Sequence, residues 1–554
     1  MNRPFPLLAL LIAGYFSVLA SRSAVASLPQ PSDGEVLLKA MGDELTRSMD
    51  KLVLEGLEKP YFLQYNAQDR VILSMSAAHG GLKQSTIKRE RGIGSRIRVG
   101  SFSMDNTNVF RGAGGRGSLP LDDDYTALRH TIWRITDEDY KRAVETLTRK
   151  VSYLQDKTME DRPDDFTPGE AVKTMQPPVR LDVDRAKWEK DMRAISAHFE
   201  KHPAIMDSGV EFYAIAVHEF MVNSEGSRIR AGDTGILLRI TAETQADDGE
   251  YLNDELQYLA ETVDKIPALE TILADIDGMC TRLVALSKAP KLEQFTGPVL
   301  FEPMAAGKVF EALLANGLCA RPTPLGAGGA WQEESLEKKI GLRVLPRSMS
   351  VVDDSTMDYF EGAPLAGQFD FDDEGTVPRK VELVAKGVLK DLVAGRAPTK
   401  KIKKTTGHAR GGEFSDPTAT AGCLYISDEN ALAVDELRLE LLTAAKEEGL
   451  EHAMRIEGME RGGGGRLGAP LYAYKVSAAD GTEELVRGLE FLPVQTRALK
   501  KILATGKERK VYNAIGSVSI SIISPAILFE ELELRKLTEE FDKLPILKAP
   551  WNRS

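Results

Sequence analysis

The chain has 554 residues, of which 42% are hydrophobic and 28% are charged, and this composition is typical of folded globular proteins and excludes a disordered chain. A chain of this length exceeds one ordinary core, so we expect at least two domains. The formal net charge of −12 disfavours binding along a phosphate backbone, so we expect no nucleic-acid partner.

The N-terminal segment 1–26 is typical of a secretory signal peptide. Arg3 provides a positive charge, an apolar run covers 6–20, and small residues lead up to Ala26, which predicts cleavage after Ala26. The alternative is an uncleaved membrane anchor, but a run of about 15 residues is shorter than the roughly 20 that span a bilayer. No later segment has spanning length. We therefore expect an exported protein, periplasmic or secreted, with no stable membrane insertion after cleavage.

The first half of the mature chain mixes helical and strand periods. Apolar spacing predicts helices at 34–59, 121–154 and 184–202, and a mostly helical segment at 254–286. Short alternating runs predict strands within 61–110 and three successive strands within 209–240, with a hairpin turn at 223–226. The segment 162–178 is rich in Pro, Asp and Thr, which indicates an exposed connection.

The second half is richer in strand patterns. Strands are predicted at 298–302, 381–384, 388–393, 472–476, 484–486, 518–523 and 527–534. Helices are predicted at 305–318, 432–448 and 496–506, and a Gly-rich loop at 326–329.

These patterns predict an α+β fold, with an N-terminal domain of helices packed on a sheet and a C-terminal domain rich in antiparallel β-sheet. The periodicity breaks near 288–297. We therefore expect domains at 27–290 and 291–540, followed by a tail at 541–554.

Two segments of the second half carry a recognisable pattern, and the first of them, residues 345–396, reads LPRSMSVVDDSTMDYFEGAPLAGQFDFDDEGTVPRKVELVAKGVLKDLVAGR. This segment resembles the core signature of the TldD/PmbA family, which is related to metallopeptidases and was once described as modulators of DNA gyrase. Residues 297–316 read GPVLFEPMAAGKVFEALLAN and are similar to the family pattern GPVVxxPxAAGxxxHExxxH. The frame matches at Gly297, Pro298, Val299, Pro303, Ala305, Ala306 and Gly307.

The same resemblance places the family's zinc ligands at positions that lack them here. Where peptidase members carry His, Glu and a second His, this chain has Glu311, Ala312 and Asn316. The resemblance also implies a cysteine ligand in the C-terminal sheet, and 516–536 contains no cysteine. A catalytic zinc needs about three protein ligands and an open position for water. We therefore expect no cofactor, and zinc only if the ligands are relocated or supplied by a partner.

The resemblance supports three hypotheses of function. In the first, the chain is a non-catalytic subunit that forms a hetero-dimer with a zinc-bearing TldD-like homologue, or pairs with itself, to process unfolded peptides. In the second, it is an active metallopeptidase with unusual ligands, which combines Glu311 with His198, His202 or His408. In the third, it is an envelope protein that binds peptides or assists assembly without catalysis.

Other polar groups are candidate cleft residues. The pair Asp353 and Asp354 ends a predicted strand, and Asp373 and Glu374 lie in an acidic turn at 372–375. Paired carboxylates could bind a cation or act as acid and base, but Asp and Gly are also what a capped turn needs, and we favour that interpretation. His408, in a glycine-bounded loop, could contact a substrate, although a plain loop residue is the simpler interpretation.

Further candidates have plainer interpretations. His198 and His202 have the i, i+4 spacing of a helical metal pair, but they precede Pro203, so we interpret them as a solvated helix end. His218-Glu219 is superficially similar to a zinc motif, yet it lies in strand-like sequence, so we treat it as coincidence. The three cysteines lie in apolar surroundings, which favours buried packing for Cys280, Cys319 and Cys423.

Overall fold

The computed structural model describes residues 28–53, 58–109, 114–155, 162–325, 335–412, 414–463 and 465–538. The predicted signal peptide at 1–26, the Gly-rich loop at 326–329 and the tail at 541–554 lie outside the described residues. No helix within the described ranges is both long and apolar enough to cross a membrane.

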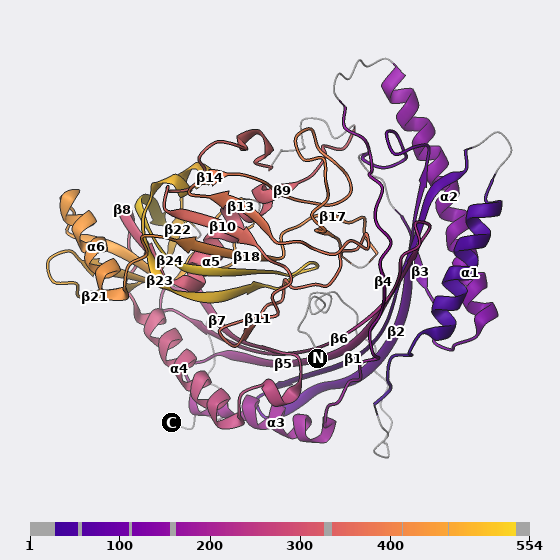
Figure 1. Ribbon diagram of the computed structural model, residues 1–554. Helices are drawn as coiled ribbons and strands as arrows, with labels where there is room; N and C mark the ends of the chain where they lie inside the picture. The colour runs from indigo at the N-terminus through magenta and orange to yellow at the C-terminus, as the bar shows by residue number, and fades with distance from the viewer. Residues whose placement is uncertain are drawn as a thin grey trace.

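The first half of the chain forms a strongly curved sheet of 7 strands in the order β3-β2-β1-β5-β6-β4, with β7 paired to β6. Its strands are β1 (Pro60–Ala78), β2 (Gly81–Val99), β3 (Gly115–Ser118), β4 (Lys173–Met175), β5 (Asp207–Asn223), β6 (Arg228–Gln245) and β7 (Tyr251–Ala260). Its helices are α1 (Glu35–Lys51), α2 (Tyr125–Gln155), α3 (Arg185–His198) and α4 (Leu269–Lys288). In Figure 1 these helices lie along the outer, convex face of the sheet.

The second half forms a mixed sheet of 11 strands in the order β14-β13-β10-β18-β24-β8-β19-β20-β21, with β22 and β23 also paired to β24. Its strands are β8 (Gln294–Phe301), β10 (Met349–Asp353), β13 (Val381–Ala385), β14 (Val388–Leu389), β18 (Cys423–Asp428), β19 (His452–Met459), β20 (Pro470–Ser477), β21 (Glu483–Val486), β22 (Leu489–Phe491), β23 (Ile502–Ala514) and β24 (Ile520–Lys536). Two helices belong to it, α5 (Pro303–Leu313) and α6 (Val434–Glu447).

Three further strand pairs lie outside the two large sheets. They are β9 (Cys319–Ala320) with β15 (Val393–Ala394), β11 (Tyr359–Phe360) with β12 (Ala363–Pro364), and β16 (Ala409–Arg410) with β17 (Thr418–Ala419).

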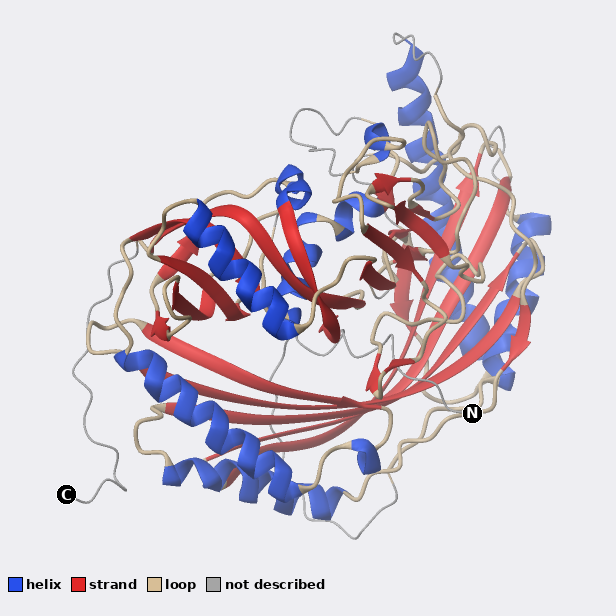
Figure 2. Cartoon of the chain, turned by 60° about the vertical axis from the view of Figure 1, so that its left-hand side comes forward, coloured by secondary structure: helices blue, strands red, loops and turns tan. Residues whose placement is uncertain are grey.

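The curved sheet is covered on both faces. Its outer face packs against the helices, for example Phe212 of β5 against Trp188 of α3, with ring centroids 4.2 Å apart. Its concave face holds the second half of the chain, which lies above the long strands in Figure 2. The buried side chain of Arg396 joins the two halves. Arg396 belongs to the second half, and its Nη2 donates to Glu225 in the β5–β6 turn at 2.7 Å. This double cover explains why β5 is buried along most of its length.

Several predicted elements are longer than their sequence patterns indicated. The runs within 61–110 form two long strands, β1 and β2, joined at His79-Gly80, where both residues have positive φ as a tight hairpin turn requires. The region 209–240 contains two strands and not three, because β5 continues without a break to the predicted turn at Asn223. The strands predicted at 518–523 and 527–534 are one strand, β24.

Two helix predictions are wrong. The segment 254–260 belongs to β7, which pairs with β6 from Tyr251 to Ala260, and the helix α4 begins only at Leu269. The segment 496–506 is a short 3-10 helix, Thr496–Lys501, followed by β23. In both places the partner strand supplies hydrogen bonds that outweigh the local helical spacing.

Candidate functional site

The helix at the family's zinc position lies directly on the second sheet. Strand β8 leads into α5, whose first turn contains Pro303, a residue suited to a helix start. The small residues at 305–307 allow close approach, since a Cβ on Gly307 would lie 2.6 Å from the Cβ of Tyr512 on β23. This contact sets the distance between α5 and the ring of Tyr512.

Glu311 on α5 is held by an ion pair and a hydrogen bond. Its Oε1 accepts from Arg461 Nε at 2.9 Å and from Arg461 Nη2 at 2.5 Å, and its Oε2 accepts from the Tyr512 hydroxyl at 2.8 Å. Arg461 also donates from Nη1 to the carbonyl of Ile515 at 2.8 Å. Burial and the Glu311 carboxylate raise the pKa of Tyr512, so its hydroxyl stays protonated and donates. Both carboxylate oxygens of Glu311 are therefore engaged by cationic or proton-donating groups.

Ala312 and Asn316 add no donor to this cluster. The α-helix ends at Leu313, and Asn316 lies in the following 3-10 helix, Ala315–Leu318, where its side chain is exposed. Lys308 points to the carbonyl of Met459, with Nζ donating at 2.5 Å, and burial lowers the pKa of this lysine.

Asp353 and His408, two candidate cleft residues, form a fully buried cluster. His408 Nε2 lies 3.2 Å from Asp353 Oδ1, and the hydroxyl of Ser355 donates to the same oxygen at 2.8 Å. Burial raises the pKa of Asp353, but hydrogen bonds from His408, the Gly422 amide and Ser355 outweigh it, so the pKa lies below its usual value. This group of Ser355, His408 and Asp353 is closed to solvent, and its hydrogen bonds hold these side chains together inside the fold.

The remaining candidate cleft residues belong to turns. Asp354 accepts from the Thr356 hydroxyl at 2.6 Å, and Glu374 Oε2 accepts from the backbone amide of Arg396 at 2.7 Å. In the acidic turn, Asp372 accepts from the backbone amides of Glu374 and Thr376 at 3.0 and 2.8 Å, which is the capped turn that the sequence favoured.

Asp373 connects this turn to the curved sheet. Its backbone carbonyl accepts from Gln64 Nε2 at 2.7 Å and from Arg96 Nη1 at 2.7 Å, and its side chain accepts from the Gly411 amide at 2.7 Å. Burial raises the pKa of Asp373, although Arg96 and Arg410 oppose the shift. Of the candidate cleft residues, Asp373 lines the large cavity described next, whereas Asp353, Asp354, Glu374 and His408 do not.

A cavity of about 1130 Å³ lies between the concave face of the curved sheet and the second half of the chain. Carboxylates outnumber cations in its lining. The acidic side chains are Asp182, Glu219, Asp233, Asp358, Asp370, Asp372 and Asp373. The basic side chains are Arg96, Arg180 and Arg410.

Crowded carboxylates are the main electrostatic feature of this cavity. Burial, and then the charge of Asp373, raise the pKa of Glu219 to about 7. Burial and the neighbouring carboxylates, Glu219 among them, also raise the pKa of Asp233 well above its ordinary value. Burial lowers the pKa of Arg410, which donates to the carbonyl of Ser519 at 3.0 Å. A cationic ligand would offset the repulsion between these carboxylates.

Glu219 and His218, which the sequence pattern indicated as a coincidental motif, lie on opposite faces of β5. His218 is fully buried, and its Nε2 accepts from the Val179 amide at 2.8 Å while its Nδ1 donates to the Ser32 carbonyl at 2.6 Å. Glu219 lines the cavity. The alternation of a strand was the signal that could have separated them.

The residues named for a relocated metal site occupy three different places. Glu311 contacts Arg461 and Tyr512, whereas His408 contacts Asp353. His198 and His202 lie at the end of α3, as the sequence indicated, but both contact a carboxylate on α4 and His198 is buried and not solvated. The described residues thus bring Glu311 together with none of these histidines.

Comparisons with known proteins address the C-terminal half and the overall fold. Residues 295–536 match the family model described as the PmbA/TldA metallopeptidase C-terminal domain. No curated protein sequence matches the chain significantly.

Solved structures with a similar fold cover most of the chain. A candidate modulator of DNA gyrase from Thermotoga maritima is 16% identical, with 90% of this chain and 99% of that chain covered and a TM-score of 0.57. TldE from Thermococcus kodakarensis is 13% identical, with coverages of 89% and 99% and a TM-score of 0.59. A second candidate gyrase modulator, from Bacteroides thetaiotaomicron, is 12% identical, with coverages of 91% and 98% and a TM-score of 0.58. At these identities the similarity establishes a shared fold.

Proposed function

Because the chain belongs to the TldD/PmbA family through its C-terminal domain, we propose that it is a non-catalytic subunit of a peptide-processing assembly. Its partner would be a zinc-bearing homologue of the same family, and its own contribution would be to hold an unfolded peptide in the large cavity. The single observation that carries this proposal is the engagement of Glu311 by Arg461 and Tyr512 at the family's zinc position.

The donor set on α5 does not fit a catalytic zinc. Such a site needs about three ligands that can share one ion, plus a general base near the metal-bound water. Here a guanidinium lies within 3 Å of the Glu311 carboxylate, at 2.9 and 2.5 Å. A zinc ion at this position would be repelled by the charge of Arg461. Ala312 offers no base, and the Asn316 amide lies exposed beyond the end of the helix.

The cavity supports a peptide as the ligand. Its volume of about 1130 Å³ is at the upper end of ordinary small-molecule sites, so it could hold a segment of several residues. Carboxylates outnumber basic groups in its lining, which favours segments that carry Lys or Arg. The glutamines and asparagine of β1 and the neighbouring loops supply polar groups that could bind a peptide backbone without regard to sequence.

The test is a reconstitution with unstructured peptides. The purified chain alone should cleave none of them, and addition of a zinc-bearing homologue from the same organism should give a stable complex and chelator-sensitive cleavage. Chelator-sensitive cleavage by the chain alone that is lost in Glu311→Gln would overturn the proposal. A chain that pairs only with itself beside such a homologue would contradict the partner role.

The envelope binding protein without catalysis remains the second candidate, because the cavity needs no metal to hold a peptide. The two candidates differ in one outcome of the same experiment. A purely binding role predicts tight capture of Lys-rich peptides and no complex with the zinc-bearing homologue. In either case we propose an exported, periplasmic or secreted, location, as the predicted signal peptide indicates.

A further inference from the structure

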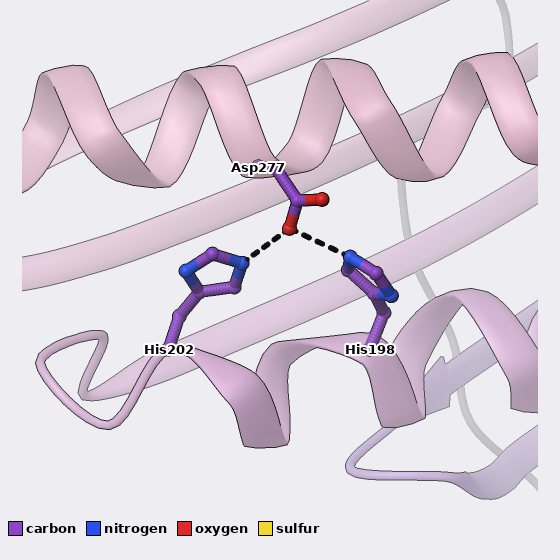
Figure 3. A group of neighbouring side chains, drawn as sticks. All are labelled: His198, His202 and Asp277. Carbon is purple, nitrogen blue, oxygen red and sulfur yellow. Dashed lines mark hydrogen bonds and ion pairs between the residues drawn. The ribbon is translucent and has the colours of Figure 1, made fainter.

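Two histidines and an aspartate meet on the outer face of the curved sheet (Figure 3). His198 is the last residue of α3, and His202 follows the short 3-10 helix Phe199–Lys201. Both turn their Nε2 atoms to one carboxylate oxygen, Asp277 Oδ1 on α4, at 2.7 Å and 2.6 Å respectively. Their ring centroids are 6.0 Å apart.

The packing of α3 against α4 holds these side chains in place. Ile195 of α3 and Phe199 of the following 3-10 helix share one buried cluster with Ile276 and Cys280 of α4. His198 is itself buried, with 8% of its surface exposed. The Asp277 side chain is 52% exposed, so the cluster has one open side toward solvent. His198 is thus held in a packed interface, and Asp277 is reachable from outside.

The three ligand atoms have the chemistry and spacing of a divalent metal site. All of them lie within 4.8 Å of one another, and this is the one group of His, Cys, Asp and Glu side chains within the described part of the chain that meets this criterion. Imidazole nitrogens with a carboxylate oxygen suit zinc and its first-row neighbours. Two histidines, a carboxylate and a water form a common tetrahedral set.

Only a small movement separates the present geometry from a bound one. Zinc lies about 2.0–2.2 Å from such ligands, so at tetrahedral angles the ligand atoms are roughly 3.3 Å apart. The Nε2–Oδ1 distances of 2.7 and 2.6 Å would each open by roughly half an ångström. The exposed Asp277 side chain can make this adjustment by a small rotation.

We propose that His198, His202 and Asp277 bind a divalent first-row transition ion of the zinc type, with water completing the coordination. The bound ion links the end of α3 to the middle of α4 and clamps the two helices together on the convex face. This site lies on the face opposite to the cavity and is independent of the proposed function, since it shares no residue with the cavity or with the Glu311 cluster.

The test is zinc binding by the full mature chain after chelator treatment and removal of the chelator. Isothermal titration with zinc should give one site per chain, and cobalt should give the visible absorption of a tetrahedral complex. The thermal midpoint should rise with free zinc concentration. His202→Ala and Asp277→Asn should each lower the affinity by at least about tenfold and remove the thermal shift.

Controls separate this site from other sources of zinc. His130→Ala removes an exposed histidine of α2 and should leave the titration unchanged, as should Glu311→Gln on α5. Circular dichroism of each zinc-free variant reports whether it folds. Failure of the wild-type chain to bind zinc, or undiminished binding by both folded ligand variants, would overturn the site. Loss of zinc only in Glu311→Gln would overturn it and the proposed function together.

Discussion

Glu219 offers a quantitative test of how the cavity's charges act on the fold. Its side chain accepts a hydrogen bond from Gln68 Nε2 at 2.9 Å, and burial with the Asp373 charge raises its pKa from 4.5 to about 7. The folded protein therefore binds this proton more tightly than the unfolded chain. Stability is lost as pH rises from about 4.5 to about 7, and the full penalty remains above that range.

The size of this loss of stability follows from the shift in the pKa of Glu219. One pKa unit corresponds to about 1.4 kcal/mol, so the rise from 4.5 to about 7 gives at most about 3.5 kcal/mol. Glu219 is only partly buried, so solvent screens part of this loss, and we expect Glu219→Gln to be about 1–3 kcal/mol more stable than the wild type at pH 8. The glutamine keeps an acceptor for Gln68 Nε2. It also brings an amide donor to Gln68 Oε1, a buried atom with no hydrogen-bond partner among the described residues.

The assay is urea unfolding of both proteins at pH 5 and pH 8. The gain in the free energy of unfolding should be large at pH 8 and mostly absent at pH 5, because pH 5 lies only slightly above 4.5, where the loss of stability has just begun, whereas pH 8 lies above both pKa values. Glu243→Gln, at an exposed position of β6, is the matched control and should show no such pH dependence. A Glu219→Gln protein that is no more stable than wild type at pH 8, or that shows the same gain at both pH values, would refute the reasoning.

Three further predictions concern other parts of the chain. Arg461→Leu should destabilise the fold by about 1–2 kcal/mol and Arg461→Leu/Glu311→Gln by less, because the single change leaves the Glu311 carboxylate without its cationic partner. Chemical denaturation of both single variants and the double variant measures this coupling. His408→Ala should lower the free energy of unfolding by about 2–4 kcal/mol at neutral pH, since it removes the group that holds the pKa of Asp353 low. This loss of stability should diminish as pH falls through the pKa of Asp353, and denaturation across pH measures it. The exported protein should begin after Ala26, which N-terminal sequencing of the secreted fraction tests, and an intact N-terminus would contradict it.

The family and the fold class were both predictable from the sequence. The TldD/PmbA assignment is confirmed by the family match over 295–536, and the α+β class agrees with the structure. Local signals also gave the turn at Asn223, whose side-chain oxygen accepts from the amides of Glu225 and Ser227 at 3.1 and 2.9 Å. Such a turn is specified by four adjacent residues, so its pattern is visible in the sequence. The predicted division into domains at 27–290 and 291–540 stays a prediction.

The missed elements depend on distant partners. The strand β7 has helical spacing of its own and becomes a strand because β6 offers it a free edge. The candidate site on α5 also depends on distant partners. The sequence indicates that Glu311 replaces a zinc ligand, but the guanidinium that binds it comes from Arg461, 150 residues further on. Asp277, which binds His198 across 79 residues, was likewise invisible from the spacing of the histidines alone.

The central claim is that α5 holds no catalytic zinc in this chain. The most direct test is the zinc content of the purified His198→Ala/His202→Ala protein, measured by elemental mass spectrometry, because these substitutions remove the proposed structural site and leave α5 untouched. We expect less than a tenth of an equivalent of zinc per chain. A full equivalent of zinc that disappears when Glu311→Gln is added would contradict it.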